Sequence, residues 1–136
     1  MTRQSTDSTG AQVTVDLDES PPVSAYVLRL ADGTRPGRAE FVDPPDTAGE
    51  RIFFHTEVDE EFSGRGLAGL LLRAALADSI GKNLTVVPVC PLFARHLKRH
   101  GGEFLADGGR FRRPTKADLA LVSRTVREEG HAVTDS

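Results

Sequence analysis

The chain has 136 residues, enough for one domain with its own hydrophobic core. Apolar residues make up 38% and charged residues 27%, a balance typical of a globular protein and unlike that of a disordered one. Seventeen basic and twenty acidic side chains give a net charge of −3, so the overall charge favours neither nucleic acid nor an anionic membrane as a partner.

The single cysteine, Cys90, excludes an internal disulfide framework, and the four histidines are too scattered to form a metal site with it. The chain has no run of about 18 apolar residues, the length that spans a membrane. Residues 1–7 also lack the apolar core of a signal peptide. We therefore expect a cytoplasmic protein without a bound metal, a nucleic-acid partner or a membrane.

The first half of the chain predicts an antiparallel meander. Residues 1–11 are polar and rich in Ser and Thr, which predicts a disordered tail. Four segments rich in β-forming residues follow, and Asp32-Gly33-Thr34 has the composition of a hairpin turn between the second and the third of them. The four predicted strands are 12–16, 23–30, 37–42 and 51–58.

The second half changes to helical spacing. Leu and Ala recur from 67 to 80 as on one face of a helix, with Gly81 as its C-cap residue. Residues 84–89 form a short apolar strand, and Pro88 leaves one side of it unpaired because proline has no N–H. The strand, helix and strand from 51 to 89 therefore predict a βαβ unit.

Two more helices complete the prediction. Cys90-Pro91 opens a helix over 92–99, with proline in its favoured first turn, and Gly101-Gly102 stops it. A last helix over 116–128 begins at Thr115 as N-cap. We thus divide the chain into a disordered tail (1–11), a single domain (12–129) and a polar tail (130–136).

A glycine-rich turn, Ser63-Gly64-Arg65-Gly66-Leu67-Ala68, lies between the strand 51–58 and the helix 67–80. At such a turn several backbone N–H groups stay unpaired beside the positive end of the helix dipole, which makes a binding site for phosphate or pyrophosphate. Gly64 and Gly66 let the backbone approach an anion closely. Arg65 could reach a phosphate or could equally point to solvent. We call residues 63–68 the glycine turn.

Three phosphate-binding motifs can be compared with it. A P-loop needs Gly-Lys-Ser/Thr, and the chain continues Gly66-Leu67-Ala68. A Rossmann turn follows the first strand of a parallel sheet, whereas this turn follows several antiparallel strands. The segment instead resembles motif A of the Gcn5-related N-acetyltransferases, Gln/Arg-x-x-Gly-x-Gly/Ala. Gly66 and Ala68 take its last two positions, and Ser63 stands where Gln or Arg is usual.

The flanking residues resemble a small acetyltransferase-like subfamily with a Cys-Pro step, over about residues 23–105. The likeness rests on His55-Thr56-Glu57-Val58, Val87-Pro88-Val89-Cys90-Pro91 and Arg99-His100 around the glycine turn. It implies an α/β (α+β) fold of the acyl-CoA N-acyltransferase type. In that fold an antiparallel meander leads into a βαβ unit whose central strands splay apart.

The resemblance also implies acetyl-CoA as cofactor, with its pyrophosphate on Ser63, Gly64, Arg65, Gly66, Leu67 and Ala68. The pantetheine arm would lie between the splayed strands and pair with Thr56, Glu57 and Val58 like an added strand. Acetyl transfer to a small amine or a protein amino group would follow. That step needs a base for the amine proton and a backbone N–H for the oxyanion.

Three residues are candidates for the chemistry. Glu57 could act as the base directly or through water, and His55 lies on the same strand face, two residues away. Cys90 precedes a helix, where the dipole stabilises a thiolate, so it could accept the acyl group or contact the sulfur of the coenzyme. Each has a structural alternative: an exposed pair for His55 and Glu57, and a small buried hydrophobe for Cys90.

Other functions stay open at this stage. The small subfamily lacks the first helices of the larger enzymes and has little with which to build an acceptor pocket. The main alternative is therefore a non-catalytic module that binds CoA or acyl-CoA. Nucleic-acid binding through the basic residues between 95 and 113 is a weaker alternative because the chain is acidic and poor in aromatics. The sequence leaves open the amine acceptor, the role of residues 106–136, and whether the protein is a monomer or a homodimer.

Overall fold

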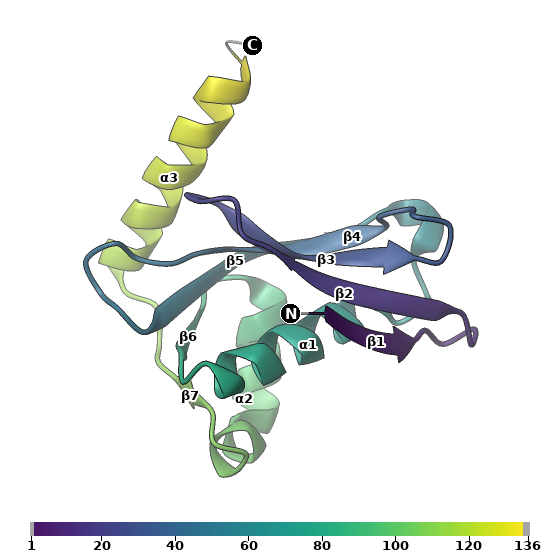
Figure 1. Cartoon of the computed structure of the whole chain (residues 1–136). Coiled ribbons are helices and arrows are strands. Elements are labelled where there is room, and N and C mark those ends of the chain that lie inside the picture. The colour runs from purple at the N-terminus through teal and green to yellow at the C-terminus, as the bar shows by residue number, and fades with distance from the viewer. Residues whose placement is uncertain (1, 135–136) are drawn as a thin grey trace.

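The structure is a computed structural model that describes the backbone of residues 2–134 and the side chains of residues 2–128. Within these residues the chain forms one seven-stranded sheet and three α-helices (Figure 1). The strands are β1 (Thr2–Thr6), β2 (Gln12–Asp18), β3 (Ser24–Leu30), β4 (Gly37–Val42), β5 (Glu50–Val58), β6 (Thr85–Pro88) and β7 (Arg110–Phe111). The helices are α1 (Leu67–Gly81), α2 (Pro91–Ala106) and α3 (Lys116–Thr134), with the short 3₁₀-helix η1 (Glu60–Phe62) before α1.

The strands lie in the sheet in the order in which they occur in the chain. Strands β1 to β5 pair antiparallel, whereas β5–β6 and β6–β7 pair parallel. Parallel neighbours need a crossover connection, and α1 and α2 supply the two crossovers. The predicted α/β fold, a meander that leads into a βαβ unit, is confirmed.

Helices α1 and α2 cover one face of the sheet (Figure 1). The main core lies beneath them and contains a row of aromatic rings. Phe53 of β5 stacks on Phe93 of α2, with ring centroids 4.4 Å apart and ring planes 10° apart. Tyr26 and Phe41 continue the row at 5.4 Å. All four side chains are buried, so this row of rings ties α2, the helix of the second crossover, to the meander.

Helix α3 lies on the opposite face (Figure 1). There Val42, Ile52 and Val87 are neighbours across β4, β5 and β6 and are all buried, although they do not belong to the main core. Leu121 and Thr125 of α3 line a pocket together with Val42. The last helix therefore covers a second, smaller apolar patch.

The N-terminal residues differ from the prediction of a disordered tail. Residues 2–6 form β1, which pairs antiparallel with β2. The buried Asp7 side chain closes the turn by accepting hydrogen bonds from the N–H groups of Thr9 (2.8 Å) and Ala11 (3.0 Å). An edge strand needs few apolar side chains, so the polar composition of residues 2–6 gave no indication of a strand. Met1 lies outside the described residues.

The second helix is longer than predicted, because Gly101-Gly102 does not stop it. Helix α2 continues to Ala106 with a kink at His100, whose backbone has φ −123° and ψ 16°. A Cβ on Gly101 would lie 2.7 Å from Cζ of Phe111. Glycine at this position therefore allows a ring from β7 to pack closely on the helix. Strand β7 itself, only two residues long, was not predicted.

The ends of the other helices differ in detail. The left-handed residue after α1 is Asn83 (φ 56°), two residues beyond Gly81. Helix α3 begins as predicted, since Asp118 accepts a hydrogen bond from the Thr115 N–H at 2.7 Å, as in a capping box. It continues to Thr134 in place of the expected polar tail, and residues 135–136 lie outside the described part of the chain. None of the described helices is both long and apolar enough to cross a membrane.

Candidate functional site

Strands β5 and β6 separate after four paired residues. Their ladder runs from Glu50 opposite Thr85 to Phe53 opposite Pro88. The Phe53 carbonyl then accepts hydrogen bonds from both Val89 N–H (3.0 Å) and Cys90 N–H (2.8 Å), and the chain turns into α2. Strand β5 continues to Val58, and within the described part of the chain it pairs there with β4 alone. The predicted splay of the two central strands is therefore present, with Phe53 and Cys90 at its vertex.

A β-bulge in β5 lies directly at this vertex. Phe53 is opposite Phe41 of β4, but the preceding residue Glu40 is opposite His55, so Phe54 is an extra residue. A bulge of this kind shifts the alternation of side chains by one position. It therefore changes which residues of β5 point toward the two helices.

Beyond the bulge, the side chains of Thr56 and Val58 face α1 and α2. Thr56 Oγ1 lies 3.4 Å from Cys90 Sγ, and Val58 packs against the main core. His55 and Glu57 face the other side of the sheet, where Nε2 of the first is 3.4 Å from Oε2 of the second. The sequence prediction that these two residues share a strand face is correct.

The backbone of β5 beyond the bulge also alternates. The Asp59 N–H donates to the Pro36 carbonyl at 2.7 Å. In a regular antiparallel ladder every second residue directs its N–H and C=O to the partner strand. Glu57 therefore pairs with β4, and the peptide groups of Thr56 and Val58 are directed toward the gap beside β6. An extended ligand could pair with this edge as an added strand.

The glycine turn has the backbone that its sequence predicts. Gly64 has φ 80° and Gly66 has φ 74°, in the left-handed region that favours glycine. Gly66 is the N-cap of α1, and no side chain caps this end of the helix. Its carbonyl accepts the Leu70 N–H at 3.2 Å and so closes the first helical turn.

The turn leaves a continuous series of N–H groups open. Among the described residues, no acceptor receives a hydrogen bond from the N–H groups of residues 64–69. Six consecutive donors thus stand at the positive end of the α1 dipole. This arrangement fits a phosphate or pyrophosphate group without any side chain.

Two polar residues of the turn have partners elsewhere, Ser63 through its backbone N–H and Arg65 through its side chain. The Ser63 N–H donates to the Glu60 carbonyl at 3.0 Å. The Arg65 guanidinium binds the Asp7 carboxylate through Nε (2.7 Å) and Nη2 (2.6 Å). Hydrogen bonds from the Thr9 hydroxyl and from Arg65 lower the pKa of Asp7 to about 2. Arg65 is therefore engaged with the N-terminal hairpin.

Arg73 is a basic residue near the turn that the sequence analysis did not select. A Cβ on Gly69 would lie 3.3 Å from its Nη1, so the guanidinium lies back along α1 toward the start of the helix. No carboxylate of the described residues is within 4.0 Å of it. In the sequence, the signal that could have indicated Arg73 is its position four residues after Gly69 on the same predicted helix.

The three candidates for the chemistry lie on two sides of the gap. Cys90 is 4% exposed and forms the N-cap of α2, with Pro91 following as predicted. The side chains of His55 and Glu57 are 50% and 57% exposed on the opposite side of β5. A group bound at the vertex could thus meet the thiol from one side and the carboxylate from the other.

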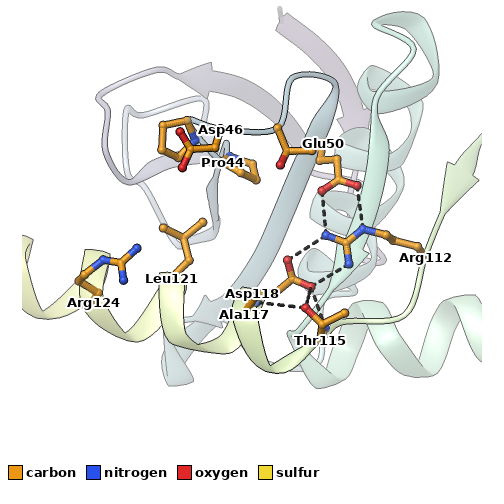
Figure 2. A pocket seen from close by; sticks show the side chains of 11 residues that line it. Pro44, Asp46, Glu50, Arg112, Thr115, Ala117, Asp118, Leu121 and Arg124 are labelled. Carbon is orange, nitrogen blue, oxygen red and sulfur yellow. Dashed lines mark hydrogen bonds and ion pairs between the residues drawn. The ribbon is translucent and has the colours of Figure 1, made fainter.

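A polar cavity lies at the other end of β5, between the β4–β5 loop and α3 (Figure 2). It has a volume of about 370 Å³. Arg112 donates to Glu50 (2.7 Å) and to Asp118 (2.7 and 2.8 Å), and it lowers the pKa of Asp118 to about 2. The guanidinium of Arg112 thus bridges the two carboxylates and anchors α3 to β5.

The two histidines of α2 lie side by side, with the ring centroids of His96 and His100 5.0 Å apart. Burial, followed by the charge of His100, lowers the pKa of His96. Among the described residues, no group of three or more His, Cys, Asp or Glu side chains could hold a metal ion.

Comparison with known proteins adds one finding. The sequence model of the GCN5-related N-acetyl-transferase family matches residues 25–107, more than half of the chain. The matched segment runs from β3 through α2 and so contains the splayed strands, the glycine turn and Cys90. Strands β1, β2 and β7 and helix α3 lie outside it. No curated protein matches the chain.

Proposed function

Because the chain belongs to the GCN5-related N-acetyltransferase family, we propose that it transfers an acetyl group from acetyl-CoA to a small amine or a protein amino group. Family membership supports an acyltransferase in general, and acetyl-CoA and the amine are the proposed substrates. The observation that carries the proposal is the series of unpaired N–H groups at residues 64–69, beside two strands that splay apart.

The N–H groups of residues 64–69 would bind the pyrophosphate of the coenzyme. Backbone donors at a helix N-terminus supply most of what such an anion needs, so Ser63 in place of a longer side chain is tolerated. The Arg73 guanidinium lies toward the same end of α1 and would contact a second phosphate oxygen.

The splayed edge of β5 would bind the pantetheine arm. Its two amides would pair with the backbone groups of Thr56 and Val58, which the alternation of the ladder directs into the gap. The sulfur end of the arm would then lie at the vertex near Cys90. Burial of this thiol, at 4% exposure, favours contact with the coenzyme over a role as covalent acyl acceptor.

The acceptor amine would approach from the side of the sheet that carries Glu57. Bound acetyl-CoA would supply the thioester: the amine nitrogen bonds to its carbonyl carbon, and the carbon–sulfur bond then breaks, so that CoA leaves as the thiolate. Glu57 would take the proton from the attacking amine, directly or through water, and His55 at 3.4 Å would support it. A backbone N–H on the splayed edge of β5 would stabilise the oxyanion.

One observation favours the alternative of a CoA-binding module without catalysis. Oε1 of Glu57 lies 3.7 Å from Nε of Arg38, and both side chains are about half exposed, as in an ordinary surface pair.

Calorimetry with CoA and acetyl-CoA tests both hypotheses together, and the absence of binding at millimolar ligand would reject both. Labelled acetyl-CoA and a panel of amines then separate them. For the enzyme we expect Glu57→Gln to lower turnover about 100-fold with unchanged CoA affinity. Glu61→Gln, an exposed glutamate of η1, is the matched control. No transfer to any amine by the wild-type protein would favour the binding module, and label on Cys90 would favour a covalent route.

A further inference from the structure

The turn between β1 and β2 (residues 7–11) lies against the glycine turn, although some 55 residues separate them in the sequence. Ser8 N–H donates to the Arg65 carbonyl at 3.0 Å, and Ser8 Oγ donates to the Gly64 carbonyl at 3.3 Å. Asp7 binds the Arg65 side chain. Three separate contacts thus join the two turns, and the β1–β2 turn belongs to a hairpin outside the family match.

Asp7 makes this contact rigid. Its side chain is fully buried and uses both oxygens. Oδ1 accepts the N–H groups of Thr9 and Ala11 and the Thr9 hydroxyl, and Oδ2 accepts the Arg65 guanidinium. The same carboxylate therefore shapes its own turn and holds the glycine turn against it.

The carbonyl contacts decide where the neighbouring N–H groups point. In a trans peptide the C=O of one residue and the N–H of the next point in opposite directions. Since Ser8 holds the carbonyls of Gly64 and Arg65, the N–H groups of Arg65 and Gly66 must point away from the hairpin. Both belong to the unpaired series at residues 64–69.

We propose that the β1–β2 turn is a positioning element for coenzyme binding: Asp7 and Ser8 hold the glycine turn so that its N–H groups face the pyrophosphate. The proposal rests on the proposed function, because it needs CoA as the ligand. Neither residue touches the anion. Both act through the two peptide groups and the side chain of Arg65.

A purely electrostatic role for Asp7 predicts the opposite effect. A carboxylate near a pyrophosphate repels it, and it also occupies the charge of Arg65. Its neutralisation would then free Arg65 for the phosphates and tighten CoA binding. The direction in which CoA affinity changes when Asp7 is neutralised therefore distinguishes a positioning role of Asp7 from a purely electrostatic one.

The test uses Asp7→Asn in the full chain. Asparagine keeps an oxygen for the N–H groups of the β1–β2 turn and replaces the oxygen that faces Arg65 by an NH₂ donor. Thr2→Val is the matched control, because it removes an exposed hydrogen bond to Asp16 in the same hairpin, away from the glycine turn. Calorimetry measures the affinity of each protein for CoA and for pantetheine, which lacks the pyrophosphate.

We expect Asp7→Asn to weaken CoA binding about tenfold through misdirected N–H groups and to leave pantetheine binding unchanged. Thr2→Val should bind both ligands like the wild type. In an Arg65→Gln background, Asp7→Asn should add no further loss, because Asp7 acts through Arg65. Ser8 is exposed, so Ser8→Ala will fold even if Asp7→Asn does not. Ser8→Ala should weaken CoA binding about twofold to threefold.

Unchanged or tighter CoA binding by Asp7→Asn, or by Ser8→Ala where only that variant folds, overturns the inference and leaves the proposed function intact. An equal loss of CoA and pantetheine binding also overturns it, because that result reports general damage to the fold. A wild-type protein that does not bind CoA overturns the inference and the proposed function together.

Discussion

The two halves of β5 differ in what surrounds them. From Glu50 to Phe53 the strand pairs with β6, Ile52 and Phe53 also pair with β4, and the charged side chains Glu50 and Arg51 have partners. From His55 to Val58 its one partner among the described strands is β4, and its side chains are exposed or half-buried. The bulge at Phe54 separates the halves.

This difference shows how one strand can serve stability and ligand binding at once. Unpaired peptide groups are costly when they are buried in a completed core. On the β6 side of β5 they occur beyond the bulge, where a bound chain can satisfy them, while the first half supplies the core contacts that hold the edge in place. Substitutions of buried side chains in the first half should therefore change stability, and substitutions that alter the backbone in or after the second half should change ligand binding.

The largest effect is expected for Arg51→Met in the first half. Arg51 is 4% exposed, donates to Asp43 and to the Tyr26 hydroxyl, and lies 4.0 Å above the Phe41 ring. Loss of one partner of a buried network should lower the free energy of unfolding by about 3 kcal/mol in urea denaturation. Arg38→Met removes an exposed ion pair with Glu57, which lies beyond the bulge. It should lower the free energy of unfolding by less than about 1 kcal/mol. Equal losses would contradict the contrast between the halves.

Asp118→Asn should lower the free energy of unfolding by about 2 kcal/mol near pH 7, because the carboxylate binds Arg112 and caps α3. The pKa of Asp118 is about 2 in the folded protein and 3.8 as the ordinary value, so its contribution is present above about pH 4 and is lost as the pH falls toward 2. The stability difference between wild type and variant should therefore shrink over that range. A difference independent of pH would show that the carboxylate charge is not involved.

Gly66→Ala should separate stability from binding. Alanine at φ 74° costs about 1 kcal/mol of folding free energy, although a Cβ would meet no atom within 4 Å. Gly33 of the β3–β4 turn has φ 89° and equally open space, so Gly33→Ala should cost the same. We expect only Gly66→Ala to weaken CoA binding in calorimetry. A similar loss of CoA affinity in both variants would argue against the glycine turn as the anion site.

The smallest effect is expected for Thr56→Val. The change replaces the hydroxyl next to Cys90 Sγ by a methyl group, and thiols are weak hydrogen-bond partners. Stability should change by less than about 0.5 kcal/mol. The affinity for CoA should stay within about twofold, because the backbone of Thr56, and not its side chain, is proposed to bind the pantetheine arm. A large loss of affinity would assign the contact to the hydroxyl.

The sequence by itself determined the local features of this protein. Periodicity and turn composition located strands β2 to β5 of the meander, the start of each α-helix and the glycine turn, because each depends on residues close together in the chain. The left-handed backbone of Gly64 and Gly66 and the shared face of His55 and Glu57 follow from the same local rules.

The tertiary structure alone decided what depends on distant partners. The bulge at Phe54 exists only in the pairing of β5 with β4, yet it turns Thr56 toward Cys90 and Glu57 away from it. Gly101 continues a helix because a ring from β7 packs on it, and Arg65 is held by Asp7 from a segment whose composition predicted disorder. A short polar strand has no local signature, since its hydrogen bonds and its one buried carboxylate are satisfied across the fold.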